Sequence, residues 1–293
     1  MKWNILKSDE DRSVNFIRQM KEGYIETRYV RRTDDYFIVY LSSHTGCKHA
    51  CRMCHLTATG QTSFEPVDMD LYLEQALQVL TYYDAVADDQ GHADSVHVNW
   101  MSRGEALSNP HLLEDNQEII GCLSCMARQR GLRAKFNIST IMPQDFRYTL
   151  VQAFGGSPVE FYYSIYSMNE KFRKRWLPRA LPVGHGLDLL SEWQKSQKRE
   201  IVLHWAFIDG ENDREADVQA ICDAVEQYGL NVRVNLVRYN PPNEKSRESP
   251  EPVIQKNLAI IKERLSVRSK IVPRVGFSVK ASCGMFVDND FFV

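Results

Sequence analysis

The sequence predicts an α/β protein built as a partial (β/α)6 barrel, and three observations support this prediction. Strand-like and helix-like stretches alternate from residue 36 to residue 274, which is typical of βα units around a parallel sheet. Polar loop residues repeatedly follow the predicted strands, at the edge where barrel enzymes place their reacting groups. Three of the seven cysteines also crowd into the loop after the first long strand.

The N-terminal part is expected to hold one helix and two strands. Residues 1–22 are interpreted as a short helical extension with an amphipathic pattern. Residues 24–31 roughly alternate apolar and polar side chains, which predicts a half-buried strand. Residues 36–41 form a nearly continuous apolar run, which is typical of a buried strand. We therefore expect an N-terminal extension over 1–22 and a barrel with a C-terminal cysteine loop over 23–293.

The rest of the chain alternates between helices and strands, giving the six βα units of the predicted barrel. The predicted helices cover residues 69–87, 110–131, 144–154, 185–197, 213–228 and 252–265. The predicted strands that follow residue 41 cover residues 95–100, 134–138, 159–165, 201–208, 232–237 and 271–274.

The cysteine loop carries the strongest chemical signal. Cys47, Cys51 and Cys54 have the spacing C-x3-C-x2-C, and thiolates are the ligands that suit iron–sulfur clusters. A [4Fe-4S] cube has four irons, so three cysteines leave one iron open to a small molecule. The spacing predicts a [4Fe-4S] cluster whose open iron binds S-adenosyl-L-methionine (SAM), a source of 5′-deoxyadenosyl radicals.

Two other interpretations of this loop remain open. C-x2-C pairs also occur in zinc sites, which require a closed set of four ligands. His49 or His55 would complete such a set. Three unrelated free thiols are the remaining interpretation, which their crowding in a polar, glycine-containing loop disfavours.

Composition and charge exclude several classes of protein. The chain has 43% hydrophobic and 25% charged residues and a net charge of −2, so it lacks the overall electrostatic footprint of a nucleic-acid-binding protein. An odd number of cysteines argues against a disulfide framework. The chain has no apolar run of about 18 residues, and its start has no apolar signal region. A cytoplasmic location without membrane contact is therefore expected.

One local stretch is strongly basic. Residues 171–179 combine lysines and arginines with a phenylalanine and a tryptophan. The stretch is either a solvated helix face with an aromatic anchor or a surface that contacts phosphates.

Several segments, in order and with compatible spacing, resemble a known family. They are Ile25-Glu26-Thr27-x-Tyr29, the cysteine loop with Thr57-Ala58-x-Gly60, Met101 to Asn109, Ser139-Thr140, Ser164 to Glu170, Asn235 to Pro241, Arg274-x-Gly276, and Ala281-Ser282-Cys283-Gly284-Met285. From about residue 23 to residue 285 the chain is similar to the radical-SAM adenosine C-methyltransferases of the RlmN/Cfr type, which methylate adenine carbons in RNA. The resemblance implies a radical-SAM partial barrel.

The resemblance also implies roles for individual residues. Cys283 would carry the methyl group, and Glu26 matches a carboxylate near the target adenine. The other matched positions would hold SAM. Gly104 and Glu105 would accept its amino group, Ser139 and Ser164 would bind its carboxylate or ribose, and Asn240 would meet its adenosyl end.

The chain departs from the family pattern in two places. The family has a second cysteine just upstream of the cluster loop, which releases the product, and Tyr40 stands there instead. Cys122, Cys125 or Cys222 could replace it, although their helical positions favour packing roles. The family also carries a small helical RNA-binding domain before the barrel, and only 22 residues precede Gly23 here.

The leading hypothesis is therefore a radical-SAM enzyme that resembles RNA adenine C2/C8 methyltransferases. A radical-SAM enzyme with another outcome, acting on a nucleotide, another small molecule or a protein-bound substrate, is the first alternative. A non-catalytic iron–sulfur protein and a zinc-binding RNA module are the others. RNA or a nucleotide and an external electron donor such as flavodoxin or ferredoxin are the expected partners.

Overall fold

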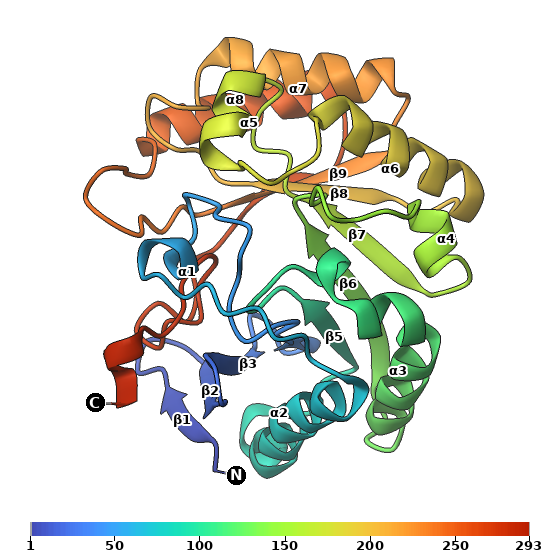
Figure 1. Ribbon diagram of the computed structural model, residues 1–293, viewed down its shortest axis with the longest axis vertical. Helices are drawn as coiled ribbons and strands as arrows, with labels where there is room; N and C mark the ends of the chain where they lie inside the picture. The colour runs from blue at the N-terminus through green and yellow to red at the C-terminus, as the bar shows by residue number, and fades with distance from the viewer. Residues whose placement is uncertain (1, 293) are drawn as a thin grey trace.

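The computed structural model describes residues 2–292 and contains a ten-stranded sheet flanked by helices (Figure 1). The strands lie side by side in chain order, so that β1 and β10 form the two edges of an open sheet. The strands are β1 (Asn4–Lys7), β2 (Val14–Gln19), β3 (Tyr24–Val30), β4 (Tyr36–Tyr40), β5 (Ser95–Trp100), β6 (Arg133–Thr140), β7 (Val159–Tyr163), β8 (Ile201–Trp205), β9 (Val232–Val237) and β10 (Ser269–Val272).

The strands from β4 to β10 are parallel to one another, with helical connections between them. Parallel strands need such crossovers, and the carboxyl ends of these strands therefore meet at one edge of the sheet. The expected α/β class, with an unclosed barrel of six βα units, is confirmed.

The prediction of a helix over residues 1–22 is wrong. Strands β1 and β2 form an antiparallel hairpin there, and β2 continues the sheet by pairing with β3. The segment from Val14 to Ile17 is buried at all four positions. Such a segment fits a strand covered on both faces, because one surface of a lone helix would face solvent. Met1 lies outside the described residues.

Strand β3 was expected to be half-buried, and it is buried along its whole length. One face packs on helix α2 (Met69–Gln90), where Thr27 Oγ1 donates a hydrogen bond to the carbonyl of Gln75. The polar face carries Glu26 and Arg28, and the C-terminal segment covers it. This cover comes from the far end of the chain, so local alternation alone cannot reveal it.

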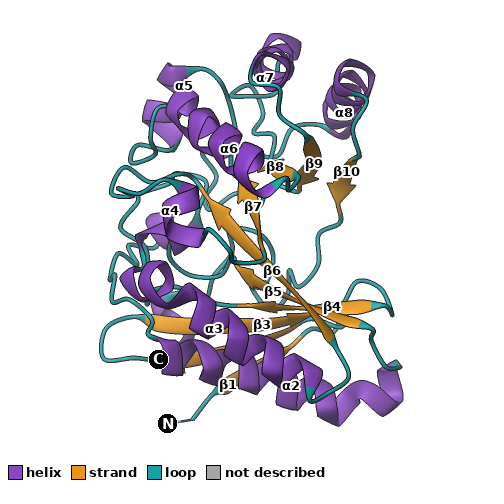
Figure 2. Cartoon of the chain, turned by 90° about the vertical axis from the view of Figure 1, so that its right-hand side faces the viewer, coloured by secondary structure: helices purple, strands orange, loops and turns teal. Residues whose placement is uncertain are grey.

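The helices flank the sheet on its outer side (Figure 2). Residues 144–149 were expected to be helical and are not, because the helix starts at the capping box of Thr149 and Gln152. Two short helices were not assigned from the sequence, α1 and α5. The helices are α1 (His55–Ala58), α2, α3 (Pro110–Arg128), α4 (Leu150–Phe154), α5 (Glu170–Trp176), α6 (Val183–Gln197), α7 (Glu215–Gln227) and α8 (Glu251–Leu265).

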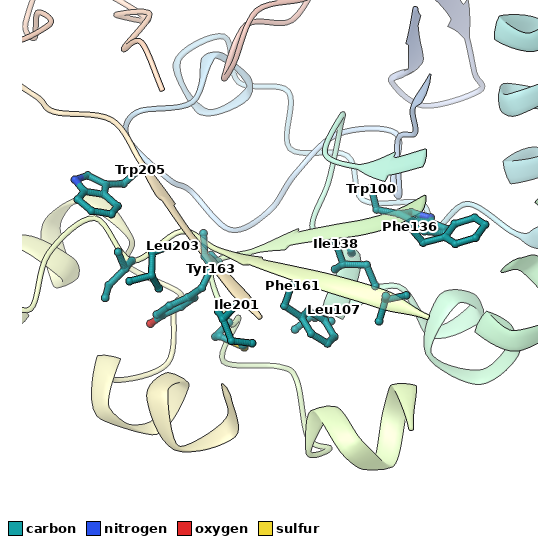
Figure 3. Packing of buried hydrophobic residues seen from close by; sticks show 14 of the residues in the cluster. Trp100, Leu107, Phe136, Ile138, Phe161, Tyr163, Ile201, Leu203 and Trp205 are labelled. Carbon is teal, nitrogen blue, oxygen red and sulfur yellow. The ribbon is translucent and has the colours of Figure 1, made fainter. Parts of the chain in front are cut away.

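The core fills the layer between the sheet and these helices (Figure 3). Side chains alternate along β7, so Phe161 and Tyr163 enter this layer while Tyr162 faces the barrel interior. Trp100 and Trp205 are buried in the same core. No helix among residues 2–292 is long and apolar enough to span a membrane.

Candidate functional site

A pocket of about 390 Å³ runs into the barrel from the loops that follow the parallel strands. It brings together most of the residues that the sequence singled out. Those that line it are Cys47, Cys51, Cys54, Gly104, Glu105, Ser139, Ser164 and Cys283. Convergence of these residues from five separate segments is the main structural support for a shared site.

The cysteine loop is held by backbone contacts to the segment that follows it. The amide of Cys47 donates a 3.0 Å hydrogen bond to the carbonyl of Gln61, and the amide of Cys54 donates to the carbonyl of Cys51 at 3.1 Å. A Cβ atom on Gly46 would meet the Ser63 and Gln61 carbonyls at 2.5 and 2.7 Å. Only glycine fits there, which explains its place beside the first cysteine.

The three cysteines of this loop are half-buried at the pocket wall. Burial raises the pKa of Cys47 to about 12 and also raises the pKa values of Cys51 and Cys54. Cys54 also raises the pKa values of Cys47 and Cys51, and Cys47 raises that of Cys51, so the three thiols share one environment. Thiolates form in such a place only when a positive centre compensates their charge, and an iron–sulfur cluster supplies one.

The donor set fits a cluster better than a single ion. Zinc draws its sulfur ligands to about 2.3 Å from one centre, whereas a cube binds each thiolate at a different iron. Within residues 2–292, no three His, Cys, Asp or Glu side chains converge on one point that could hold a metal ion. The thiols of Cys47, Cys51 and Cys54 nevertheless line one pocket, as ligands of a larger group would.

Gly104 and Glu105 lie between the cysteine loop and β6. Gly104 has a φ of +92°, and a Cβ atom there would meet His44 Nδ1 and Ser43 Oγ at 2.6 Å. The Glu105 carboxylate accepts hydrogen bonds from the amides of Leu107 and Ile141, both at 3.2 Å. Burial raises the pKa of Glu105 to about 7. The Thr140 side chain also donates to this carboxylate. A buried carboxylate that has no cationic partner among residues 2–292 suits an ammonium group.

Asn240 does not line the pocket but holds the loop that carries Cys283. Its Nδ2 donates to the Cys283 carbonyl at 2.8 Å and to Ser282 Oγ at 3.1 Å. Its Oδ1 is buried and has no partner in the described part of the chain. The side-chain amide of Asn240 is therefore committed to the loop.

Cys283 reaches the cysteine loop from the opposite end of the sequence. The amide of His55, next to Cys54, donates a 3.0 Å hydrogen bond to the carbonyl of Gly284. Cys283 is accessible from the pocket, but the surrounding protein raises its pKa to about 11. Cys54 also raises this pKa, whereas Arg28 and Arg32 lower it. The thiol therefore lies between the cysteine loop and a group of cations.

Glu26 lies behind the pocket wall rather than in the pocket. It is fully buried, and Arg103, Arg28 and Asn15 bind its two carboxylate oxygens at 2.6 to 3.0 Å. The amide of Val287 donates to the same carboxylate at 3.0 Å. A position of Glu26 beside a target base, as the family resemblance implies, does not fit this geometry, because neither carboxylate oxygen remains free to meet a substrate.

The residues around Glu26 form a clamp on the C-terminal segment that the sequence did not reveal. Arg103 Nη2 and Gln61 Nε2 both donate to the Val287 carbonyl, at 2.9 and 2.8 Å. Arg28 Nη2 donates to the Met285 carbonyl at 2.6 Å. Arg28 could have been found, because residues i and i+2 of a strand share a face and Glu26 lies two residues earlier. Gln61 and Arg103 had no comparable local signal.

Tyr40 lines the pocket together with Cys283. Cys122 and Cys125 lie on α3 and Cys222 is buried in α7, and none of the three lines the pocket as the structure describes it. A second thiol for Cys283 is therefore not among the described pocket residues outside the cysteine loop.

The basic stretch 171–179 is largely structural. It begins with helix α5, on which Phe172 and Trp176 are buried. Arg173 is also buried and donates to the Ile165 carbonyl at 2.7 Å. An aromatic anchor with exposed lysines and arginines around it matches the first of the two expected readings.

Comparison with known proteins adds an independent line of support. No protein-family model matches the chain. The chain is 25% identical over 261 residues to a probable dual-specificity RNA methyltransferase RlmN of Synechococcus sp. (strain RCC307), covering 86% of this chain and 70% of the relative. It is 23% identical to the protein of the same name in Staphylococcus saprophyticus, covering 96% and 74% of the two chains.

Solved structures show the same fold. A radical SAM methyltransferase from Sphaerobacter thermophilus superposes with a TM-score of 0.79 at 18% identity, over 96% of this chain and 79% of that one. Streptococcus suis SuiB bound to S-adenosylmethionine gives a TM-score of 0.57 at 11% identity, over 86% and 53% of the two chains. The chain is a distant relative of the RlmN-type radical-SAM methyltransferases and has the fold of a radical-SAM methyltransferase.

Proposed function

We propose that the chain is a radical-SAM enzyme that transfers a methyl group to an adenine carbon of RNA through Cys283. The observation that carries this proposal is the contact between the Cys283 loop and the cysteine loop, through the His55 amide and the Gly284 carbonyl. Two segments more than 200 residues apart place four thiols around one pocket. A cluster held by Cys47, Cys51 and Cys54 would then lie beside the methyl carrier.

The two cofactors would supply the reactive groups. When bound, the cluster and SAM supply a methyl group for polar transfer and, after one-electron reduction, a 5′-deoxyadenosyl radical. The protein's task is to bind and orient them. Glu105 would accept the SAM ammonium, and Ser139 and Ser164 would donate hydrogen bonds to its carboxylate or ribose. Gly104 would let the backbone approach closely.

Cys283 would act as the methyl acceptor. Its thiol would lose a proton and form a new S–C bond, while the methyl group leaves its original sulfonium sulfur. The pKa of about 11 keeps the thiol protonated at rest, so it would lose its proton only as the methyl transfer proceeds. Arg28 and Arg32 favour the thiolate and would assist that loss.

Glu26 would be a positioning residue in this account. Its carboxylate binds the Val287 amide and the two arginines that hold the carbonyls of Met285 and Val287. It would fix the segment that ends the Cys283 loop, without contact to the reacting atoms. The side-chain amide of Asn240 would do the same on the other side of the loop.

Tyr40 favours a second candidate function, a radical-SAM reaction with a different outcome. A substrate joined to Cys283 through the transferred carbon needs a second thiol for release in the methyltransferase pattern. Tyr40 stands at that position and lines the pocket. In this candidate function the reaction on the nucleotide would end without thiol-dependent release.

Anaerobic reconstitution followed by product analysis tests these proposals. The reconstituted protein, given SAM, a reductant and RNA, should release 5′-deoxyadenosine and produce methyladenosine. RNA that remains covalently attached to Cys283 would favour the second candidate function. Absence of 5′-deoxyadenosine would contradict both. A small acidic electron-transfer protein, such as a flavodoxin or ferredoxin, would serve as the reductant.

A further inference from the structure

The pocket is electrically polarised along its length. Glu105 is the one carboxylate among its described lining residues, and it lies near the cysteine thiols, whose pKa values it raises. Six basic side chains line the rest of the pocket, namely Arg28, Arg32, Arg233, Arg238, Lys270 and Arg274. The part of the pocket lined by these six side chains, its basic end, therefore requires negatively charged groups to balance them.

Four of these six cations already have carboxylate partners. Arg28 pairs with Glu26, and Arg238 and Arg274 pair with carboxylates outside the pocket. Arg233 is bound at 2.6 and 2.7 Å by Glu160, which lies on β7, and by Glu200, which directly precedes β8. Within residues 2–292, no carboxylate lies within ion-pair distance of Arg32 or Lys270. These two charges are left without a counterion.

Arg32 and Lys270 line the same pocket although they come from distant parts of the sheet. Arg32 lies in the connection between β3 and β4, and Lys270 lies on β10, the far edge strand (Figure 2). Burial and the positive charges of Arg32 and Arg233 lower the pKa of Lys270. Arg32 and Lys270 therefore interact electrostatically. Like charges that face one another without a counterion are unfavourable until an anion joins them.

Two buried polar atoms that lack hydrogen-bond partners also belong to residues lining this part of the pocket. The Nε of Arg32 is buried and has no hydrogen-bond partner, while another part of its guanidinium is hydrogen-bonded to Tyr40. His204 Nδ1 is likewise buried and unpartnered, and burial together with Arg32 lowers the pKa of His204 to about 4. An oxyanion would accept a hydrogen bond from Arg32 Nε, and also from His204 Nδ1 in the tautomer that carries its proton on that nitrogen.

We propose that Arg32 and Lys270 form an anion-binding subsite that takes a phosphate group of the substrate beside Cys283. Arg32 presents a planar fork that matches a phosphate, and Lys270 adds a point charge at the rim. Arg32 lies close enough to Cys283 to lower the pKa of its thiol. A nucleotide held there by its phosphate would extend its base towards the sulfur. Assignment of the anion to the substrate rests on the proposed function, whereas anion binding itself does not.

The same charges argue against SAM as the occupant. SAM carries a sulfonium centre, which two unpaired cations would repel. The buried carboxylate of Glu105, at the other end of the pocket, suits the positively charged end of SAM. The basic end is thus left for the anionic reactant.

Titration of the anaerobically reconstituted protein with adenosine 5′-monophosphate and with adenosine tests the subsite. Calorimetry should show that the monophosphate binds about tenfold or more tightly, as expected for charge-assisted hydrogen bonds. Arg32→Gln and Lys270→Gln should each remove most of that difference, and Arg32→Lys should retain part of it. Lys262→Gln, an exposed lysine on α8, is the matched control and should leave the difference intact.

Equal binding of the two probes by the unmodified protein would overturn the subsite, as would no measurable binding of the monophosphate. Competition between the monophosphate and SAM would assign the cations to SAM and would also overturn it. A short single-stranded oligoribonucleotide distinguishes the sources of phosphate, because tighter binding of the oligonucleotide identifies RNA and tighter binding of the monophosphate identifies a free nucleotide. Phosphate-dependent binding without methylation of Cys283 would leave the subsite standing and reject the proposed function.

Discussion

The amide of Val287 donates a 3.0 Å hydrogen bond to the carboxylate of Glu26, joining the C-terminal segment to a strand near the start of the chain. Arg103 completes the link, since it binds both the Glu26 carboxylate and the Val287 carbonyl. All three residues are buried. The position of the Cys283 loop therefore depends on a buried ion pair whose members, Glu26 and Arg103, lie 261 and 184 residues before Val287 in the sequence.

Glu26→Gln should loosen the C-terminal segment. Removal of one partner from a buried ion pair leaves an uncompensated charge and costs about 3–5 kcal/mol in the free energy of unfolding. We expect a lower melting temperature and a several-fold faster alkylation of Cys283, measured by mass spectrometry of its peptide. Cys125, which is exposed on α3, should react at an unchanged rate in the same sample.

Glu114→Gln, at an exposed position of α3, is the matched control and should change neither quantity. Iron content and 5′-deoxyadenosine release should survive in Glu26→Gln if the residue only positions the loop. Unchanged alkylation of Cys283 together with lost product formation would instead support a direct catalytic role of Glu26.

Gly104→Ala should impair SAM binding. The new Cβ atom would lie 2.6 Å from His44 Nδ1 and Ser43 Oγ, at a φ of +92° that alanine disfavours. The strain is on the order of 1–3 kcal/mol, and its relief would displace the neighbouring Glu105. Equilibrium binding of SAM to the reconstituted protein measures the effect. Gly121→Ala, in the middle of α3 with open space around its Cβ, should leave affinity unchanged and stabilise the helix by about 1 kcal/mol.

Glu105 should make the stability of the cluster-free protein depend on pH. Its pKa is raised from 4.5 to about 7 by burial, so the folded state holds this proton more tightly than the unfolded state. The stability linked to that proton is fully present below pH 4.5 and is lost as the pH rises through 7. Urea unfolding at pH 5 and pH 8 should show that Glu105→Gln gains up to ~3 kcal/mol relative to the unmodified protein between the two conditions. A pH-independent difference would contradict a raised pKa.

The sequence was most informative where local pattern and fold agree. The parallel strands and the cysteine loop could be predicted because apolar runs, turn residues and ligand spacing are all local features. The hairpin at Val14 to Ile17 could not, since its apolar residues fit a helical pattern until the sheet that buries both faces is known. Tertiary burial overrides a weak local pattern in such a segment.

The chemistry of the site could be predicted from the sequence, but the residues that hold its loops in place were harder to predict. Cys283, Glu105 and the three loop cysteines meet in one pocket as expected. Glu26 matched a family position, yet its ion pair with Arg103 depends on contacts 77 residues apart in the chain. Arg32 and Lys270 had no motif at all, because only the folded sheet brings the connection after β3 and the last strand to one pocket.

Mass spectrometry of the C-terminal peptide tests most directly whether Cys283 carries the methyl group. The anaerobically reconstituted protein should be incubated with SAM and then digested, beside a Cys222→Ala variant as the control for a buried thiol elsewhere. One added methyl group is expected on Cys283, in the unmodified protein and in the control alike. An unmodified Cys283 thiol after SAM exposure, or substrate methylation by Cys283→Ala, would contradict it.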